Sequence, residues 1–496
     1  YTIFKMINIQ RNFFIETILL ETKFFKQKDI IDLPYKDYIN ISNNDDLNLI
    51  FIDIDRLDNL KKIYKDIKSL KSKKKKVIFI PVSKQIKKID KFINHIEKGE
   101  FNNLILINLN KLKISKLIDT SREKIYKSYL SLEAQLTLSK VIENIINLLS
   151  NKDIRLLSLD LDDTCWTGVI GEDGMNNIYL DNYQKKSLSY INRLILKTGL
   201  LVSFHSKNER ILGNKGISNK LSKYKSLVNK SFKYISWNSK LNSIKQIANL
   251  VNFSKKNIFY FDDNISEIKQ LNKFLVKENC LWIKSSYIFF LYSKSLFVSN
   301  INKEKNTKRF IDIKSNIQRS GVTDTSGILN YIKTSNVKVN FSIKKINLQR
   351  FVEMSNKTNQ FNANYLRLNS INLRKYKKDK NFNLITFSVS DKYSDSGIIA
   401  AIILEKKNNF FQINEFLISC RALGRNLEYI FISQIIKNFS IKDLRICYLK
   451  TERNEPFIKF AEKIKLKRNI KNYLININMI NKFVSKYEKF IKIKIN

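Results

Sequence analysis

Residues 156–166 constrain the fold of this chain more than any other stretch of its sequence. An apolar run at residues 156–159 ends in Asp160 and Asp162, two carboxylates that are separated by one residue. A short apolar run predicts a parallel strand that is buried on both faces. Ligands of open α/β sheets bind at the carboxyl ends of the strands. The sequence therefore predicts two acidic side chains at a reaction centre.

The alternation of apolar runs and amphipathic segments continues on both sides of this stretch. It is typical of α/β layers with a parallel sheet. Strands are predicted at residues 49–54, 77–82 and 104–107, and again at 200–204 and 258–261. Helices are predicted at residues 131–149, 183–196 and 240–250. The span 283–335 is less regular, and we expect it to bridge domains.

The pattern changes from residue 337 onward to longer strands in which apolar and polar residues alternate. These strands are predicted at residues 337–343, 382–390, 397–405 and 410–419. A helix at 424–436, a strand near Cys447 and a helix after Glu455 follow them. A meander followed by helix, strand and helix is typical of an α+β domain. Together with the length of 496 residues, this change predicts about three domains.

Composition limits the classes of partner. The formal charge of +45 is compatible with nucleic-acid binding, but lysine is spread over every segment, so we favour a compositional bias over a nucleic-acid surface. No apolar run reaches the roughly 18 residues that a membrane span requires. The four cysteines form neither a disulfide framework nor a metal-type spacing, which predicts a reducing, cytoplasmic setting.

Reactive side chains recur in a fixed order at the predicted strand and helix ends. In chain order they are Asp160, Asp162 and Thr164, then Ser206, then Lys240, and then Asp262 with Asp263. Carboxylate oxygens suit Mg²⁺, while hydroxyl and ammonium groups suit phosphoryl oxygens. A single Asp-x-Asp pair is often only a turn. The full order predicts a site for phosphoryl transfer.

This order resembles the four motifs of the haloacid dehalogenase (HAD) superfamily. The resemblance implies that Asp160 is the nucleophile that forms an aspartyl-phosphate, and that Asp162 protonates the leaving oxygen and then activates water. It implies phosphate binding by Thr164, Ser206 and Lys240, and a Mg²⁺ site formed by Asp160, Asp162, Asp262 and Asp263. The motif spacings leave no room for a separate cap domain, so we expect an open site that suits a substrate presented on a carrier or covered by the flanking domains.

Several segments resemble one subgroup of that superfamily, the FkbH-type proteins, more closely. These segments are residues 159–174, 206–209, 237–240, 261–264, 357–362 and 419–425. The resemblance implies an α/β chain with a degenerate SGNH-hydrolase-like domain, a HAD-like parallel sheet and a GNAT-like acyltransferase domain of α+β type. The expected limits are 1–125, 126–300 and 336–496, with a linker at 301–335.

The subgroup resemblance also implies a function. The enzyme would dephosphorylate 1,3-bisphosphoglycerate and load its glyceryl group as a thioester on the phosphopantetheine arm of an acyl carrier protein, as in polyketide biosynthesis. Two alternatives stay open at this point. One is a plain phosphatase that acts on a free phosphorylated metabolite, and the other is a basic protein that binds nucleic acid.

Two cysteines compete for the role of acceptor thiol. Cys420 precedes Arg421, Gly424 and Arg425, in a loop-to-helix turn whose N–H groups could hold an oxyanion or a pyrophosphate. Cys165 lies beside the predicted nucleophile, where the family usually has leucine, which favours a packing role. We therefore favour Cys420, and a buried structural thiol is the alternative for both.

Other positions depart from the family pattern. His205 replaces a cysteine, and as a lone histidine we expect it to be a hydrogen-bonded neighbour rather than a general base. Asn426 replaces a glycine, and asparagine tolerates the left-handed conformation. The polar residues 358–362 are expected to form either a capped helix end or a substrate contact.

Overall fold

The computed structural model describes most of the chain. The described residues are 7–13, 15–22, 30–34, 47–57, 59–69, 76–97, 103–123, 128–151, 154–251, 253–296, 298, 303–343, 346–419, 422–452, 454–469 and 472–496. The chain divides into two compact units, Tyr1–Thr307 and Lys308–Asn496. Within the described ranges, no helix is both long and apolar enough to cross a membrane.

The first unit begins with a sheet of parallel strands in the order β2-β1-β3-β4-β5. Its strands are β1 (Ile7–Arg11), β2 (Ile30–Pro34), β3 (Leu47–Asp53), β4 (Lys76–Val82) and β5 (Leu104–Leu106). Helices α2 (Leu60–Ser69) and α3 (Ile86–Glu97) bury apolar residues against one face of this sheet. The apolar runs predicted β3, β4 and β5, whereas β1 and β2 are further strands that the sequence analysis missed.

A second parallel sheet in the first unit carries the predicted reactive residues. Its order is β10-β9-β6-β7-β8, which places β6 in the middle. The strands are β6 (Leu156–Asp160), β7 (Leu201–Ser206), β8 (Ser231–Ile235), β9 (Ile258–Asp262) and β10 (Cys280–Trp282). Every residue of β6, β7 and β9 is buried, as expected for strands covered on both faces.

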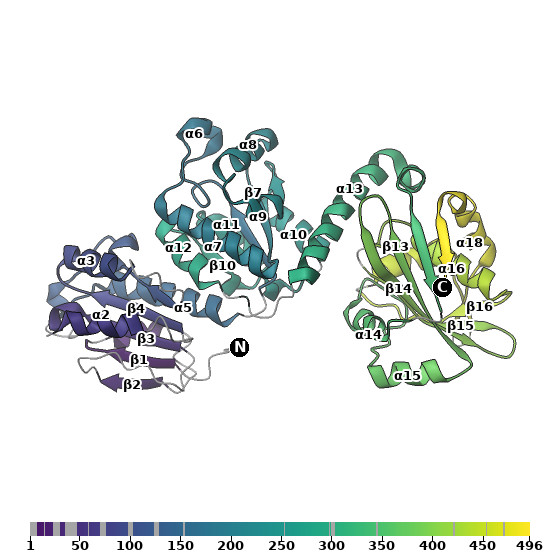
Figure 1. Ribbon diagram of the computed structural model, residues 1–496, viewed down its shortest axis with the longest axis horizontal. Helices are drawn as coiled ribbons and strands as arrows, with labels where there is room; N and C mark the ends of the chain where they lie inside the picture. The colour runs from purple at the N-terminus through teal and green to yellow at the C-terminus, as the bar shows by residue number, and fades with distance from the viewer. Residues whose placement is uncertain are drawn as a thin grey trace. The chain divides into compact units, whose positions relative to one another are not determined.

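Helices cover the second sheet and connect its strands (Figure 1). They are α5 (Leu132–Ser150), α6 (Ile170–Asn177), α7 (Asn182–Thr198), α8 (Arg210–Lys220), α9 (Lys225–Asn229), α10 (Lys240–Val251), α11 (Ile265–Leu271) and α12 (Ser286–Ser295). Helix α5 begins where the Ser131 hydroxyl accepts a hydrogen bond from Ala134 N–H, which is an N-cap. Helix α12 packs against α5 and α7, and Tyr292 Oη lies 2.7 Å from Asn144 Nδ2. These contacts belong to one continuous apolar core that also reaches the first sheet.

The span expected to be irregular is mostly helical. Besides α12, the long helix α13 (Lys303–Thr334) occupies it, and Gly327 interrupts α13 with a positive φ of 77°. Among the residues of α13 whose burial is described, the buried apolar side chains are those of Phe310, Ile313, Tyr331 and Ile332, and such a sparse apolar pattern gives a weak periodic signal in the sequence. Packing of these few residues, rather than a strong amphipathic pattern, fixes the helix.

The second unit contains a mixed sheet in the order β17-β18-β16-β15-β14-β13-β11-β19, with β12 paired to β15. Its central pairs are antiparallel, whereas β15 and β16 are parallel. The strands are β11 (Lys338–Ser342), β12 (Phe361–Asn362), β13 (Phe382–Ser390), β14 (Asp395–Lys406), β15 (Phe411–Ile418), β16 (Leu444–Ile446), β17 (Lys467–Asn469), β18 (Asn472–Leu474) and β19 (Lys492–Ile495). The meander β13-β14-β15 followed by a helix, a strand and a helix has the predicted order of elements, whereas the two helices between β11 and β13 were not predicted.

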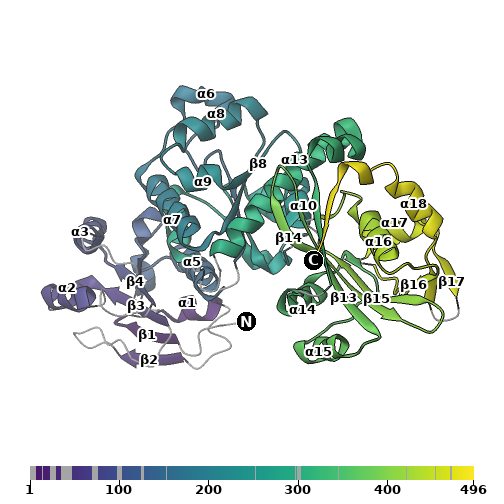
Figure 2. The same ribbon diagram turned by 45° about the vertical axis from the view of Figure 1, so that its right-hand side comes forward.

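Helices cover both faces of this mixed sheet, as Figures 1 and 2 show. Helices α14 (Leu348–Lys357) and α15 (Ser370–Lys378) pack on one face, against Ala401 and Ile403. Helices α16 (Leu427–Asn438), α17 (Glu455–Lys463) and α18 (Ile477–Val484) pack on the other, against Ala400 and Ile402. The period of two along β14 explains its nearly continuous apolar sequence. The SGNH-like and GNAT-like assignments and the domain limits remain predictions.

Candidate active site

The site lies at the carboxyl ends of three neighbouring parallel strands. Asp160 ends β6, Ser206 ends β7 and Asp262 ends β9. Because β6 lies between β7 and β9 and all three are parallel, their last residues meet at one edge of the sheet. Lys240 reaches the same place as the first residue of α10. The fold thus brings together residues that lie up to about a hundred positions apart in the sequence.

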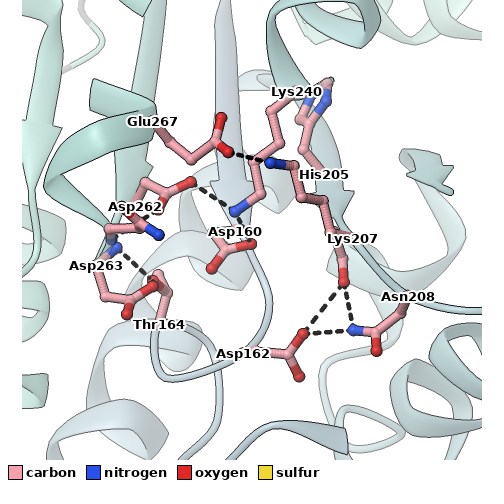
Figure 3. A network of polar contacts seen from close by, with 12 residues as sticks. Asp160, Asp162, Thr164, His205, Lys207, Asn208, Lys240, Asp262, Asp263 and Glu267 are labelled. Atoms are coloured by element: carbon pink, nitrogen blue, oxygen red, sulfur yellow. Dashed lines mark hydrogen bonds and ion pairs between the residues drawn. The ribbon is translucent and has the colours of Figure 1, made fainter. Parts of the chain in front are cut away.

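Lys240 joins two of the carboxylates (Figure 3). Its Nζ lies 2.6 Å from Asp160 Oδ1 and 2.8 Å from Asp262 Oδ2, and all three side chains are almost completely buried. Tyr260 Oη donates a hydrogen bond of 2.6 Å to the same Asp262 oxygen, and Asn264 N–H donates to the other one. Asp262 is therefore fixed by three donors.

Burial and the interactions between neighbouring charges shift the pKa values of Asp160, Asp263 and Lys240. Burial, together with Asp262, raises the pKa of Asp160 well above its usual range, although Lys240 opposes the shift. Burial and Asp262 also raise the pKa of Asp263. Burial disfavours the charged form of Lys240, but Asp160 and Asp262 outweigh that effect and raise the pKa of this ammonium group. The carboxylates carry more negative charge than one lysine neutralises.

Three of these acids fit a hard divalent cation. Oxygens of Asp160, Asp262 and Asp263 lie within 4.8 Å of one another. Thr164 positions the third, because its Oγ1 accepts from Asp263 N–H at 3.1 Å and lies 3.4 Å from Asp263 Oδ1. An oxygen-only set with excess negative charge is the donor chemistry that Mg²⁺ prefers. The residues therefore fit the Mg²⁺ cofactor that the sequence predicts.

Asp162, the fourth predicted metal ligand, is not in this carboxylate cluster. Its Oδ1 accepts from Trp166 Nε1 and from Ile170 N–H, each at 3.0 Å. Its Oδ2 accepts from Ser206 Oγ at 3.3 Å and from Asn208 Nδ2. These donors come from the loop after β6, from the first residue of α6, from the last residue of β7 and from the loop that follows β7. The carboxylate of Asp162 is held as a hydrogen-bond acceptor beside the cluster.

Two of the three predicted phosphate-binding residues have other partners in this structure. Thr164 is bound to Asp263, as described, and is fully buried. Ser206 Oγ contacts Asp162 and accepts a hydrogen bond of 2.7 Å from Asn208 Nδ2. Thr164 therefore shapes the metal cluster, and Ser206 contacts the predicted acid and base.

Several site residues were missed by the sequence analysis, namely Tyr260, Asn208 and Glu267. Glu267 lies in α11 and forms an ion pair with Lys207. Tyr260 lies two residues before Asp262, and Asn208 lies two residues after Ser206. Side chains two residues apart in extended backbone point to the same side, so this spacing was the signal available in the sequence.

His205 and Cys165 have structural surroundings. Both ring nitrogens of His205 are hydrogen-bonded, to Ser243 Oγ at 2.7 Å and to Ser203 Oγ at 2.9 Å. Burial, with a contribution from Lys240, lowers the pKa of His205 to about 3, so its imidazole is neutral. Cys165 is fully buried in the apolar core, and burial raises the pKa of its thiol well above the usual range. These surroundings fit a packing role for Cys165.

The second predicted centre, in the second unit, is described only in part. Cys420 and Arg421 lie outside the described residues. Gly424 has a positive φ of 78°, and Asn426, which precedes α16, has the left-handed φ of 55° that asparagine tolerates. The side chain of Arg425, the residue before Asn426, belongs to a separate network of polar contacts.

Arg425 is 2% exposed and lies among charged groups of its own unit. Its Nη2 donates to Asn316 Oδ1 at 2.9 Å, and its Nη1 lies 3.8 Å from Asp391 Oδ2. Arg319 binds the same carboxylate, with Nε at 2.7 Å. Burial, together with Arg319, lowers the pKa of Arg425 to about 10. The guanidinium predicted to contact an acyl or coenzyme group is thus part of an internal ion-pair network.

The polar residues 358–362 bind mainly to their own surroundings. Asn362 Nδ2 donates to the carbonyl of Thr358 at 3.0 Å, and Asn362 Oδ1 accepts from Tyr365 N–H at 2.7 Å. Asn454 Nδ2 donates to the Asn362 carbonyl at 3.0 Å. These bonds agree with the capped helix end rather than with a free substrate contact.

No protein-family model and no curated protein sequence matches this chain. Solved structures are similar to part of it. One is the N-terminal part of a Bacteroides fragilis protein containing a phosphatase domain, complexed with Mg, which is 18% identical, with 59% of this chain and 94% of that chain covered and a TM-score of 0.36. Another is 3-deoxy-D-manno-octulosonate 8-phosphate phosphatase from Moraxella catarrhalis, which is 11% identical, with 38% and 99% covered and a TM-score of 0.21.

A third similar structure, from Legionella pneumophila, is assigned to subfamily III A of the HAD superfamily. It is 13% identical, with 36% of this chain and 99% of that chain covered and a TM-score of 0.22. At this level of similarity, none of these proteins identifies what this chain acts on. The chemistry follows from the site residues themselves.

Proposed function

We propose that the first unit is a Mg²⁺-dependent phosphatase of the HAD type with Asp160 as its nucleophile. The observation that carries this proposal is the position of the Asp160 carboxylate, at the end of the central strand, 2.6 Å from Lys240 Nζ and within the acidic cluster with Asp262 and Asp263. A nucleophilic carboxylate next to a fixed cation and a site for a divalent cation is what phosphoryl transfer requires.

The reaction proceeds in two displacements. An oxygen of Asp160 attacks phosphorus, and the aspartyl-phosphate bond forms as the bond between phosphorus and the leaving oxygen breaks. Asp162 gives its proton to that leaving oxygen. Asp162 then removes a proton from water, whose oxygen attacks phosphorus, so that inorganic phosphate leaves and Asp160 is restored.

The two oxygens of Asp162 have different neighbours. Oδ1 faces two N–H donors, of Trp166 and Ile170. Oδ2 accepts from Asn208 Nδ2 and from the hydroxyl of Ser206, and this hydroxyl can accept as well as donate. Oδ2 is therefore the oxygen of Asp162 whose neighbours include a group able to accept a hydrogen bond.

The remaining polar groups prepare the site for a dianionic phosphate. Mg²⁺, when bound, neutralises charge on the phosphoryl oxygens and reduces their repulsion with Asp160. Tyr260 and Thr164 hold Asp262 and Asp263 in the orientations that this ion needs. Lys240 keeps a positive charge at the nucleophile throughout.

We further propose, from the subgroup resemblance, that the phosphatase acts on 1,3-bisphosphoglycerate and that the glyceryl group is loaded as a thioester on an acyl carrier protein. Support for a protein partner comes from two exposed tryptophans at the carboxyl ends of the two outermost strands, on opposite sides of the sheet. Trp237, after β8, is 73% exposed, and Trp282, at the end of β10, is 36% exposed. Exposed tryptophans are enriched at protein interfaces. Cys420 is the proposed acyl acceptor.

The second candidate is a plain phosphatase that acts on a free metabolite. The observation that favours it is the burial of Arg425 in an ion-pair network, which removes one of the residues assigned to the acyl or coenzyme loop. In that case the second unit would be a binding platform.

One incubation tests both candidates. The full chain is mixed with 1,3-bisphosphoglycerate, Mg²⁺ and a holo carrier protein, and both proteins are analysed by intact mass while phosphate release is followed. A glyceryl adduct on the carrier that is lost in Cys420→Ser supports the leading proposal. Rapid phosphate release without an adduct supports the plain phosphatase. Phosphate release that persists in Asp160→Asn contradicts both.

A further inference from the structure

The ion pair between Lys207 and Glu267 has no role in the reaction proposed above. Lys207 Nζ lies 2.5 Å from Glu267 Oε1. Lys207 directly follows β7, and Glu267 lies in the first turn of α11, which follows β9. Because β6 lies between these two strands, the pair reaches across the carboxyl end of the strand that carries Asp160 (Figure 3).

The local backbone directs Lys207 away from the acid and base. Its neighbours Ser206 and Asn208 both turn toward Asp162 and bind its Oδ2. Residues 207 and 208 form a bend after β7, and Lys207, which lies between these two neighbours, contacts Glu267 instead.

The two members of the pair differ in their exposure. The side chain of Glu267 is 6% exposed, and its Oε2 has no hydrogen-bond partner among the described residues. The side chain of Lys207 is 45% exposed. A buried carboxylate requires a cation, and Lys207 supplies this charge from the solvent side. Its ammonium has three donors, and the bond to Glu267 uses one of them.

Comparison with Lys240 clarifies what Lys207 can do. Lys240 is 8% exposed and is fixed between two carboxylates. Among the described residues, Glu267 is the one partner of Lys207, bound through one oxygen, and the lysine has a flexible four-carbon stem. Lys240 therefore belongs to the fixed reaction centre, whereas Lys207 is a cation at the open side of the site that can turn to a bound molecule without leaving Glu267.

We propose that Lys207 binds a second anionic group of the substrate, in addition to the scissile phosphate. This inference rests on the proposed phosphatase function and specifies its substrate class, which is phosphate compounds that carry a further carboxylate or phosphate. Without substrate, Glu267 holds the ammonium over the end of β6. With substrate, the ammonium bridges Glu267 and the second anion, which charge-assisted hydrogen bonds favour.

The test compares 3-phosphoglycerate with glycerol 3-phosphate, which has a hydroxymethyl group in place of the carboxylate. The ratio of kcat/KM for the two compounds is measured with Mg²⁺ in the full chain, in Lys207→Met and in Lys207→Met/Glu267→Gln. The double variant avoids leaving Glu267 charged and unpaired in the interior. Lys269→Met, on the exposed side of α11, is the matched control.

We expect the unaltered protein to favour 3-phosphoglycerate by about tenfold or more, as a charge-assisted contact provides. The ratio should fall to about one in both Lys207 variants and stay unchanged in Lys269→Met. An unchanged ratio in the double variant, with hydrolysis intact, would overturn this inference and leave the phosphatase standing. If neither compound is hydrolysed, calorimetric binding of the same pair with Mg²⁺ decides the role of Lys207. A preference for 3-phosphoglycerate that is lost in both Lys207 variants supports the inference, and equal affinities of the unaltered protein for the two compounds overturn it.

Discussion

The neutral, buried His205 makes a quantitative prediction about stability in acid. The pKa of His205 is lowered to about 3 in the folded chain, from an ordinary value of 6.5. A group with a depressed folded-state pKa binds its proton more tightly when unfolded, so its contribution to stability is full above pH 6.5 and is lost as pH falls toward 3. At pH 5 this histidine is mostly protonated in the unfolded chain and mostly neutral in the folded chain. The free energy of unfolding at pH 5 is therefore lower by about 2 kcal/mol, because pH 5 lies 1.5 pH units below the ordinary pKa of 6.5 and each unit is worth about 1.36 kcal/mol.

Tryptophan fluorescence can measure this loss, because Trp166, Trp237 and Trp282 all lie in the first unit. Urea unfolding is followed at pH 7.5 and pH 5.0 for the natural chain and for His205→Gln, whose amide can bind Ser203 and Ser243 without titrating. Other titrating groups are common to both proteins, so the change in their stability difference isolates the histidine. We expect the natural chain to lose about 2 kcal/mol more than the variant between the two pH values. Equal losses in both proteins would refute the argument.

Two further predictions concern the metal cluster and the second unit. Tyr260→Phe removes the 2.6 Å hydrogen bond to Asp262, one of the carboxylates of the cluster. We expect the Mg²⁺ affinity, measured by calorimetry, to fall about tenfold in this variant and to stay unchanged in Tyr179→Phe, whose tyrosine is exposed. Equal affinities in the two variants would contradict this role of Tyr260. Asn426→Ala keeps a φ of 55° but removes the short polar side chain that lets asparagine adopt this left-handed conformation. We therefore expect the free energy of unfolding of the second unit, followed by far-ultraviolet circular dichroism, to fall by about 1 kcal/mol. Asn426→Gly should lose none, and equal losses in both variants would show that the asparagine side chain, not its backbone, matters.

Much of the site could be predicted because its residues follow apolar runs. The run before Asp160 and the run before Asp262 are strands of the expected length, and parallel pairing brings their ends to one edge. Chain order and spacing were therefore enough to predict which residues would be near one another. The less regular span around α13 was predicted only to bridge domains, and its long helix was missed, since its apolar residues do not follow a clear period.

The hydrogen-bond and ion-pair partners of the individual side chains could not be predicted from the sequence. The sequence places Asp162 and Thr164 next to the nucleophile, but it does not say that four donors bind the first or that the second binds Asp263. Arg425 likewise looked like a ligand-binding residue, and its burial against Asn316 depends on a helix more than a hundred positions earlier in the chain. Such contacts depend on side-chain directions that periodicity does not encode.

The sequence by itself determined that carboxylates, a hydroxyl and a lysine would gather at the carboxyl edge of a buried parallel sheet, because strand patterning and parallel pairing leave them no other place. Only the tertiary structure decided which of these groups contact one another. It fixed Lys240 between Asp160 and Asp262, and it extended Lys207 across β6 to Glu267. The physical reason is that an ion pair forms wherever a buried carboxylate and a cation can meet, and that meeting is set by strand order and helix packing rather than by local sequence.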